Sequence, residues 1–154
     1  GSGNLAVLRP AGETDAIHPE AGLSAAVLRE FLDADVVVIG APMYNFGIPS
    51  QLKAWIDRIA VRGKTFRYTE NGPEGLARGK KVIVAGTYGG FHPAGGASNH
   101  IEPYLRFLFG FLGVDDVSFV TAEGLGVSPE QRGKSMGAAH EAIGQVPVPL
   151  KLAA

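Results

Sequence analysis

The run Asp35-Val36-Val37-Val38-Ile39-Gly40 decides the fold, and the stretch Ala41-Pro42-Met43-Tyr44-Asn45-Phe46 follows it directly. A continuous β-branched run is typical of a strand that helices cover on both faces of a parallel sheet. Pro49 then suits the first position of a helix. The stretch 41–46 is therefore predicted to be a loop at the carboxyl end of a buried strand, where open α/β sheets bind their ligands.

This loop offers a thioether, a phenol, an amide and a phenyl ring within four residues. Polarizable and aromatic groups suit a flat, partly apolar ring. Asn45 adds hydrogen bonds for the edge of a heterocycle. The candidate ligand is a planar cofactor such as a flavin, while the alternative is a loop that only closes the end of the core.

Helices and strands alternate along the rest of the chain. Helices are expected at residues 23–33, 49–63, about 98–112 and 129–143, and strands at 36–39, 81–86 and 117–121. Irregular structure is expected at residues 9–22, 64–79 and 145–154, whereas residues 4–8 fit a strand or a helix end. This alternation implies a parallel sheet with right-handed crossovers in one domain, residues 1–154, in which residues 1–3 read as a cloning remnant.

Composition limits the function classes. With 45% hydrophobic and 19% charged residues the chain has enough apolar content for a core. A net charge of −1 gives no electrostatic reason to expect nucleic acid or a membrane surface as a partner. No apolar run approaches the ~20 residues that span a bilayer, and no secretory signal is evident. The chain has no cysteine, which excludes disulfides and thiolate catalysis and fits the reducing cytoplasm.

A second candidate loop, Thr87-Tyr88-Gly89-Gly90, follows the strand at 81–86 in the same way that residues 41–46 follow the first strand. This position favours ligand contact over an ordinary turn. His92 lies just beyond and is either solvated or orients a substrate. Tyr68 is either part of a surface aromatic pair or a dimer contact.

Other kinds of chemistry find no support in the sequence. The four histidines are not at metal-ligand spacing, so we expect no metal site. Neither a phosphate-binding Gly-x-x-x-x-Gly-Lys-Ser/Thr loop nor a Gly-x-Ser-x-Gly elbow is present.

Three stretches together resemble one family. They are residues 41–46, the run Thr65-Phe66-Arg67-Tyr68-Thr69-Glu70-Asn71-Gly72-Pro73-Glu74-Gly75, and Gly89-Gly90-Phe91-His92. With their spacings intact from about residue 4 to 144, they resemble the FMN-dependent NADH:quinone oxidoreductases, or azoreductases, of the flavodoxin-like superfamily. The resemblance implies a homodimer with one FMN per subunit. It also implies electron transfer from NADH or NADPH to quinones or azo compounds.

The resemblance also assigns roles to residues. It implies that FMN contacts come from Pro42, Met43, Tyr44, Asn45, Phe46, Thr87, Tyr88, Gly89 and Gly90. The family often has serine and arginine where this chain has Thr87 and Tyr88, which bears on nicotinamide or substrate preference. His92 matches a substrate-side histidine, and Tyr68 matches an aromatic that reaches the active site of the partner subunit. His92 and Tyr68 are therefore the expected catalytic residues.

One family feature is not found. The family begins with a strand and a serine-rich loop that binds the FMN phosphate at a helix N-terminus. We expect a doubly wound, flavodoxin-like parallel sheet that lacks its first two strands, so that the three strands here are numbers 3, 4 and 5 of the order 2-1-3-4-5. Three explanations stay open: truncation, a missing half supplied by something else, or another way for the remaining half to cover its edge, such as exchange of elements between protomers. The alternative functions are an FMN-binding electron-transfer module and an inactive chain that folds by association.

Overall fold

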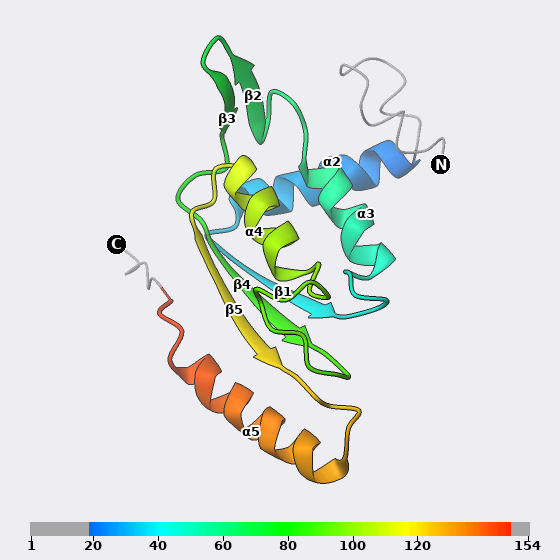
Figure 1. The fold of residues 1–154 in the computed structure, drawn as a ribbon. Coiled ribbons are helices and arrows are strands. Elements are labelled where there is room, and N and C mark those ends of the chain that lie inside the picture. The colour runs from blue at the N-terminus through cyan, green and yellow to red at the C-terminus, as the bar shows by residue number, and fades with distance from the viewer. Residues whose placement is uncertain (1–18, 149–154) are drawn as a thin grey trace.

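The computed structural model describes residues 19–148, so the predictions for residues 1–18 and 149–154 lie outside the described residues. The described elements are α2 (Pro19–Asp33), β1 (Val36–Pro42), α3 (Ser50–Ile59), β2 (Phe66–Thr69), β3 (Gly72–Gly75), β4 (Lys81–Thr87), α4 (Glu102–Phe111), β5 (Asp116–Ala122) and α5 (Pro129–Gly144). The first sheet has the order β1-β4-β5, and both of its pairings are parallel (Figure 1). The predicted α/β alternation is therefore confirmed.

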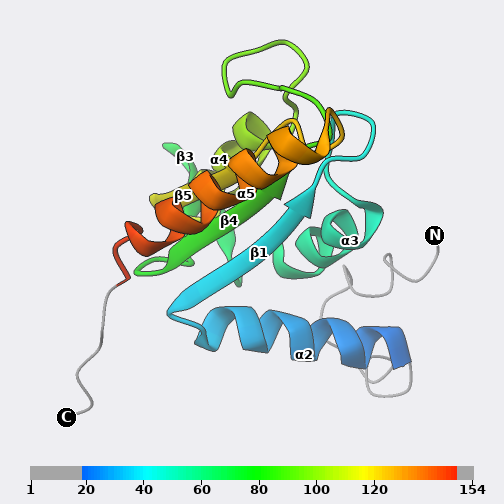
Figure 2. The same ribbon diagram turned by 90° about the horizontal axis from the view of Figure 1, so that it is seen from below.

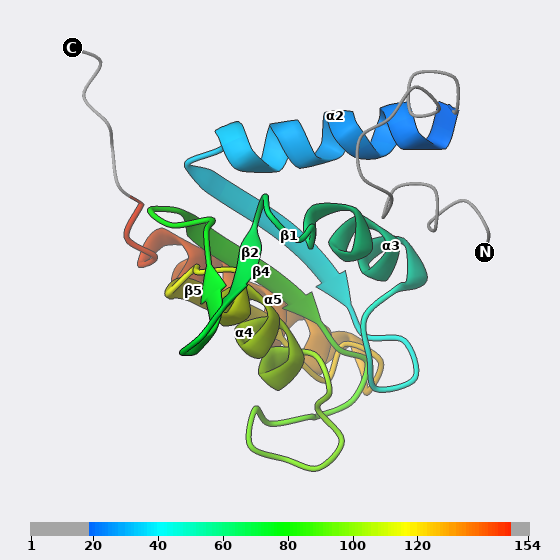
Figure 3. The ribbon, with the colours of Figure 1, turned by 90° about the horizontal axis from the view of Figure 1, so that it is seen from above.

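Helices cover the sheet unequally on its two faces. Helices α3 and α4 pack on one face and α5 on the other, whereas α2 lies beyond the free edge of β1 (Figures 2 and 3). Side chains of β1 alternate accordingly: Ile39 and Ala41 are buried, while Val38 on the opposite face is 70% exposed. Helix α5 therefore shields β5, but β1 lacks a cover on that side among the described residues.

The main core lies between the sheet and the layer of α3 and α4. Its largest fully buried apolar side chains are Phe31, Ile56, Ile59, Val82, Val84, Tyr88, Ile101, Leu105, Phe109, Leu112 and Val114. A smaller cluster under α5 joins Val120, Ala122 and Ala139. Ser128 caps the start of α5, since its side chain accepts a hydrogen bond from Gln131 N at 3.1 Å.

Three predicted helix boundaries were wrong. Helix α2 already begins at Pro19, a favourable first helical position within the segment expected to be irregular. Helix α3 ends at Ile59 rather than at Gly63. Helix α4 begins at Glu102 rather than near Ser98, because Asn99 accepts hydrogen bonds from the first backbone amides of that helix and so holds the preceding residues in a loop.

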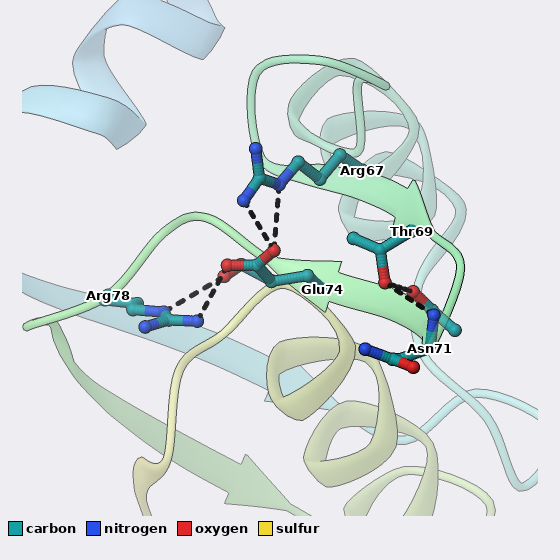
Figure 4. Close-up of polar contacts among 7 residues, drawn as sticks. Arg67, Thr69, Asn71, Glu74 and Arg78 are labelled. Carbon is teal, nitrogen blue, oxygen red and sulfur yellow. Dashed lines mark hydrogen bonds and ion pairs between the residues drawn. The ribbon is translucent and has the colours of Figure 1, made fainter.

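The segment 64–79, predicted to be irregular, contains an antiparallel hairpin of β2 and β3. The Thr69 hydroxyl accepts from Asn71 N and donates to Gly72 O, which closes the turn, and Gly72 takes a φ of 106°. Glu74 pairs with both Arg67 and Arg78 across and behind the hairpin (Figure 4). Glycines and Pro73 masked the strand pattern, although proline is compatible with an isolated edge strand.

The base of this hairpin meets the end of α4 backbone to backbone. A Cβ built on Gly75 would overlap the backbone of Leu112 and Gly113. Gly113 itself has a φ of 96° and follows Leu112, the C-cap of α4, where glycine is the usual residue. Ala77 N donates to Leu112 O at 2.8 Å and continues the contact.

Because of this close approach, a glycine-to-alanine substitution should change the free energy of unfolding in opposite directions at Gly75 and at Gly22. Gly75→Ala should lower the free energy of unfolding by about 1–3 kcal/mol, because the added methyl group forces the two backbones apart. Gly22→Ala is the matched control: no atom lies within 4 Å of its new methyl group in α2, so helix propensity should raise stability by about 0.5–1 kcal/mol. Urea unfolding of both variants measures the effects, and equal values for the two would contradict the packing described.

Candidate active site at the carboxyl ends of β1 and β4

The register of β1 against β4 places the two predicted loops side by side. Pro42 is opposite Thr87 at the end of the ladder. One further bond, from Met43 N to Thr87 O at 2.9 Å, extends the pairing into the loops. The prediction that both stretches are loops throughout was wrong at their first residues, because Ala41 and Pro42 still belong to β1 and Thr87 to β4. The residues that follow, 43–46 and 88–90, leave the sheet together, as the order of adjacent parallel strands requires.

The first loop is a tight turn with two exposed aromatic rings. Tyr44 and Gly47 exchange both backbone hydrogen bonds at 3.0 Å. Asn45 and Phe46 between them take φ values of 48° and 71°, which is the backbone of a two-residue primed turn. Asparagine tolerates this left-handed conformation but phenylalanine does so at a cost. The turn leaves Tyr44 61% and Phe46 53% exposed.

The second loop is pinned by the segment that follows β5. Gly124 N donates to Gly90 O at 2.7 Å, and Gly126 N donates to Gly89 O at 2.9 Å. Gly124 has a φ of 69°, and a Cβ there would press into the ring of Phe91. Among the hydrogen bonds of residues 19–148, the backbone N–H groups of Gly89 and Gly90 have no acceptor. These two donors are therefore available to a ligand.

His92 is held from three directions. Its backbone N–H donates to the Glu123 carboxylate at 2.7 Å, and its carbonyl accepts from the Asn99 side chain at 3.0 Å. Its ring Nδ1 lies 2.7 Å from Ser98 Oγ. Asn99 is buried, and its side-chain oxygen accepts from Ile101 N and Glu102 N, so it joins the loop to the start of α4.

The two loops meet at His92 and Phe46. Their rings lie edge to face, with centroids 5.7 Å apart at 78°. His100 N donates to Phe46 O at 3.1 Å, which joins the first turn to the segment before α4. The structure thus brings together His92 and the expected flavin-binding residues from both loops.

Tyr88 differs from its neighbours because its side chain points inward. It is only 1% exposed, and among the described residues its hydroxyl has no hydrogen-bond partner with good geometry. Burial raises the pKa of the Tyr88 phenol, and the nearby Asn99 and Thr121 side chains counteract this only in part. A contact of this residue with a ligand would therefore come from its backbone. Thr87 beside it is exposed, while Pro42 and Met43 are half-buried and Met43 packs on the core.

Tyr68 lies apart from this cluster within one chain. It is on β2 of the hairpin, whose base packs at the C-terminal end of α4, while the His92 loop precedes the N-terminal end of that helix (Figure 1). The ring is 60% exposed and carries the Arg62 guanidinium 5.3 Å from its centroid. Tyr68 therefore projects from the opposite end of the sheet.

Sequence reasoning missed three residues of the site. Ser98, Asn99 and Glu123 position the histidine but carry no motif of their own. The position of Asn99 just before a helix, and that of Glu123 just after a strand, are the signals that could have revealed two of them. Within residues 19–148, no group of three histidine or acidic side chains is placed to hold a metal ion, and no helix is long and apolar enough to cross a bilayer.

The arrangement suits the ring of a flavin. The first turn has exposed phenol and phenyl groups beside the amide of Asn45, and the backbone donors of Gly89 and Gly90 have no acceptor among the described residues. Stacking surfaces and donors beside each other match a planar heterocycle with polar edges.

The sequence of this chain matches a known family and several known proteins. Residues 5–146 match the family described as having a flavodoxin-like fold. An FMN-dependent NADH:quinone oxidoreductase of Bradyrhizobium sp. (strain BTAi1) is 56% identical over 142 residues, which cover 90% of this chain and 71% of the relative. An oxidoreductase of the same description from Xanthomonas axonopodis pv. citri is 61% identical over 120 residues, covering 78% and 62%. The chain thus spans less than the full length of both relatives.

Solved structures show the same fold. The azoreductase AzrA superposes with a TM-score of 0.78 at 30% identity, covering 92% of this chain and 72% of that one. An FMN-dependent NADH-azoreductase of Bacillus anthracis, solved in complex with FMN, gives a TM-score of 0.77 at 26% identity, covering 94% and 73%. The family and fold expected from the three sequence stretches are confirmed. With paired loops at the carboxyl ends of its parallel strands, the chain belongs to the flavodoxin-like family of FMN-dependent NADH:quinone oxidoreductases.

Proposed function

We propose that this chain binds FMN between its two loops and transfers electrons from NADH or NADPH to a quinone or an azo compound. The observation that carries the proposal is the convergence of residues 41–46 and 87–90 on His92, with exposed rings and unpaired donors facing solvent. The relatives that share these segments are described as FMN-dependent NADH:quinone oxidoreductases. The cysteine-free chain suits the reducing cytoplasm as its place of action.

FMN supplies the redox chemistry, and the residues of this chain hold and shield its ring. The two exposed rings of the first turn, Tyr44 and Phe46, provide stacking surface and exclude water. The side-chain amide of Asn45 and the backbone amides of Gly89 and Gly90 are the hydrogen-bond donors for the polar edge of the ring. The rigid ladder beneath the loops keeps these groups in place.

His92 is proposed to face the electron acceptor. Ser98 fixes the rotation of the imidazole, and Glu123 and Asn99 fix the backbone on both sides of it. A histidine held in this way can offer a hydrogen bond to a quinone oxygen or an azo nitrogen without losing further freedom.

We further propose that two copies assemble so that Tyr68 of each reaches the loops of the other. Two features support this: the hairpin projects from the end of the sheet opposite its own loops, and an exposed tyrosine at its surface is typical of an interface. Light scattering of the purified chain tests the assembly, and Tyr68→Ala in a dimer should impair acceptor reduction.

Replacing Phe46 tests the flavin contact. Phe46→Ala should weaken FMN binding by about 2- to 10-fold, because one aromatic stacking contact is lost. Phe107→Ala is the matched control, since its ring is 75% exposed and belongs to α4 rather than to either loop. Titration of flavin fluorescence gives the two dissociation constants. Equal affinities in both variants would mean that the flavin does not contact the first turn.

Replacing His92 separates acceptor binding from cofactor binding. His92→Ala should raise KM for a quinone by about 2- to 10-fold, since it removes one hydrogen bond, while FMN affinity changes little. His140→Ala, an exposed histidine on α5, should match the parent chain. Steady-state reduction of a quinone by NADH with saturating FMN measures this, and a parent-like KM for His92→Ala would remove the histidine from the acceptor site.

The same samples distinguish the rival functions. An electron-transfer module would bind FMN yet show no reduction by NADH under anaerobic conditions. An inactive chain would show no heat on titration with FMN. Reduction of the bound flavin by NADH, followed by reoxidation with a quinone, supports the enzymatic function.

A further inference from the structure

The ring of His92 is contacted by a serine hydroxyl at one of its two nitrogens. Ser98 Oγ lies 2.7 Å from His92 Nδ1, and both side chains are half-buried. A serine hydroxyl can either donate or accept a hydrogen bond. The distance alone therefore allows two neutral forms of the imidazole, with the proton on Nδ1 or on Nε2, and these tautomers offer opposite hydrogen-bonding groups to a ligand.

The hydrogen bonding of Ser98 favours one of these forms. Within residues 19–148, His92 Nδ1 is the one hydrogen-bond partner of the Ser98 hydroxyl. If Nδ1 carried the proton, Ser98 would have to accept it, and the serine proton would point to no described acceptor. A polar group left without a partner costs free energy in a half-buried position. The arrangement in which Ser98 donates to an unprotonated Nδ1 is therefore favoured.

No acidic side chain opposes this preference at the ring. Glu123 Oε1 accepts from the backbone N–H of His92 at 2.7 Å, and among the described residues no carboxylate forms a hydrogen bond or an ion pair with the imidazole. A carboxylate at Nδ1 would hold the proton there and leave Nε2 as a base. A hydroxyl donor at Nδ1 does the reverse and leaves the proton on Nε2.

The second ring nitrogen faces the glycine loop. A Cβ built on Gly90 would lie 3.2 Å from His92 Nε2 and 3.9 Å from the next two ring atoms, so Nε2 is the part of the ring closest to Gly90. Within residues 19–148, Nε2 has no hydrogen-bond partner. An Nε2–H group is thus placed beside the loop expected to hold the flavin, where a ligand can accept from it.

The surroundings of His92 fix the orientation of its ring. The Asn99 side chain donates to His92 O at 3.0 Å and accepts from the backbone at the start of α4, so the residue next to Ser98 is itself held. The imidazole packs edge to face against Phe46 and Tyr88, with centroids 5.7 Å and 6.0 Å apart. A half-turn of the ring would place a carbon at Ser98 in place of Nδ1 and lose the hydrogen bond.

We propose that Ser98 is a positioning residue, which donates to His92 Nδ1 and so keeps the neutral imidazole in its Nε2–H form. His92 then presents a hydrogen-bond donor, rather than a base, to the oxygen or nitrogen atom of the acceptor that gains negative charge on reduction. This hydrogen bond transfers no proton, so both residues keep theirs and the reduced acceptor takes its proton from water. The tautomer does not depend on the proposed function, whereas its effect on the acceptor rests on that function.

The NMR shifts of the imidazole nitrogens test the tautomer directly. The full chain is labelled with a nitrogen isotope, and long-range proton–nitrogen correlations are recorded at a pH that keeps the imidazoles neutral. Loss of signals in His92→Ala assigns the ring. His92 Nδ1 should show the shift of an unprotonated nitrogen, and Nε2 that of a protonated one. Exposed His140 of α5 gives the average of both tautomers in the same sample.

Two substitutions at Ser98 separate the effect of its hydroxyl from that of its bulk. Ser98→Ala removes the donor, so the nitrogen shifts of His92 should move toward the averaged values of His140. Ser98→Thr keeps a hydroxyl and should give the parent shifts. Urea unfolding midpoints show whether both variants are folded. The parent spectrum alone already decides between the tautomers, so the test does not depend on either variant.

Kinetics test whether Ser98 acts through the histidine. The assay is steady-state reduction of a quinone by NADH with saturating FMN. Ser98→Ala should lower kcat/KM for the quinone by about 2- to 5-fold, because the ring loses its fixed tautomer and orientation. Ser98→Thr should match the parent chain. In the His92→Ala background, Ser98→Ala should have no further effect.

Two spectra would overturn the proposal: a His92 ring protonated at Nδ1, and a ring whose shifts equal those of His140. An effect of Ser98→Ala that persists without His92 would overturn the claim that the serine acts through the histidine. Failure of the proposed function has a different signature, because the expected tautomer would then be seen in a chain that reduces no quinone.

Discussion

The parallel ladder between β1 and β4 is the constraint on which the rest of the structure depends. Its register places Pro42 opposite Thr87, and the bond from Met43 N to Thr87 O carries the pairing one residue further. Because both strands end at the same level, their loops leave the sheet as neighbours. Every later contact of the site, including that between Phe46 and His92, presupposes this alignment.

Much of this arrangement was predictable because the signals are local. The β-branched run at Val36–Ile39 identifies its strand without any knowledge of tertiary contacts. Both candidate loops follow such runs, so their place at one edge of the sheet also followed from the sequence. The three matched stretches then identified the family.

What the sequence did not reveal depends on contacts between distant residues. The hairpin of β2 and β3 is held by the ion pairs of Glu74 with Arg67 and Arg78 and by its contact with α4. No alternation of apolar and polar residues marks its strands in the sequence. The inward orientation of Tyr88 follows from space in the core above Gly86, which no local pattern records. The hydrogen bond from the His92 backbone N–H to the Glu123 carboxylate joins residues 31 positions apart. Such long-range pairings are invisible to spacing rules.

Strand β1 contributes to two different surfaces of the molecule. Its carboxyl end presents the aromatic turn at residues 44–47, and its free side borders a groove that side chains of α2 and α3 also line. The hairpin adds a different mechanical property. Since Gly75 and Gly113 touch backbone to backbone, no flexible side chain lies between the hairpin and α4 to absorb a shift. The arm that carries Tyr68 is therefore rigidly coupled to the same helix whose other end Asn99 joins to the His92 loop, so a tilt of that one helix would move both aromatic surfaces together.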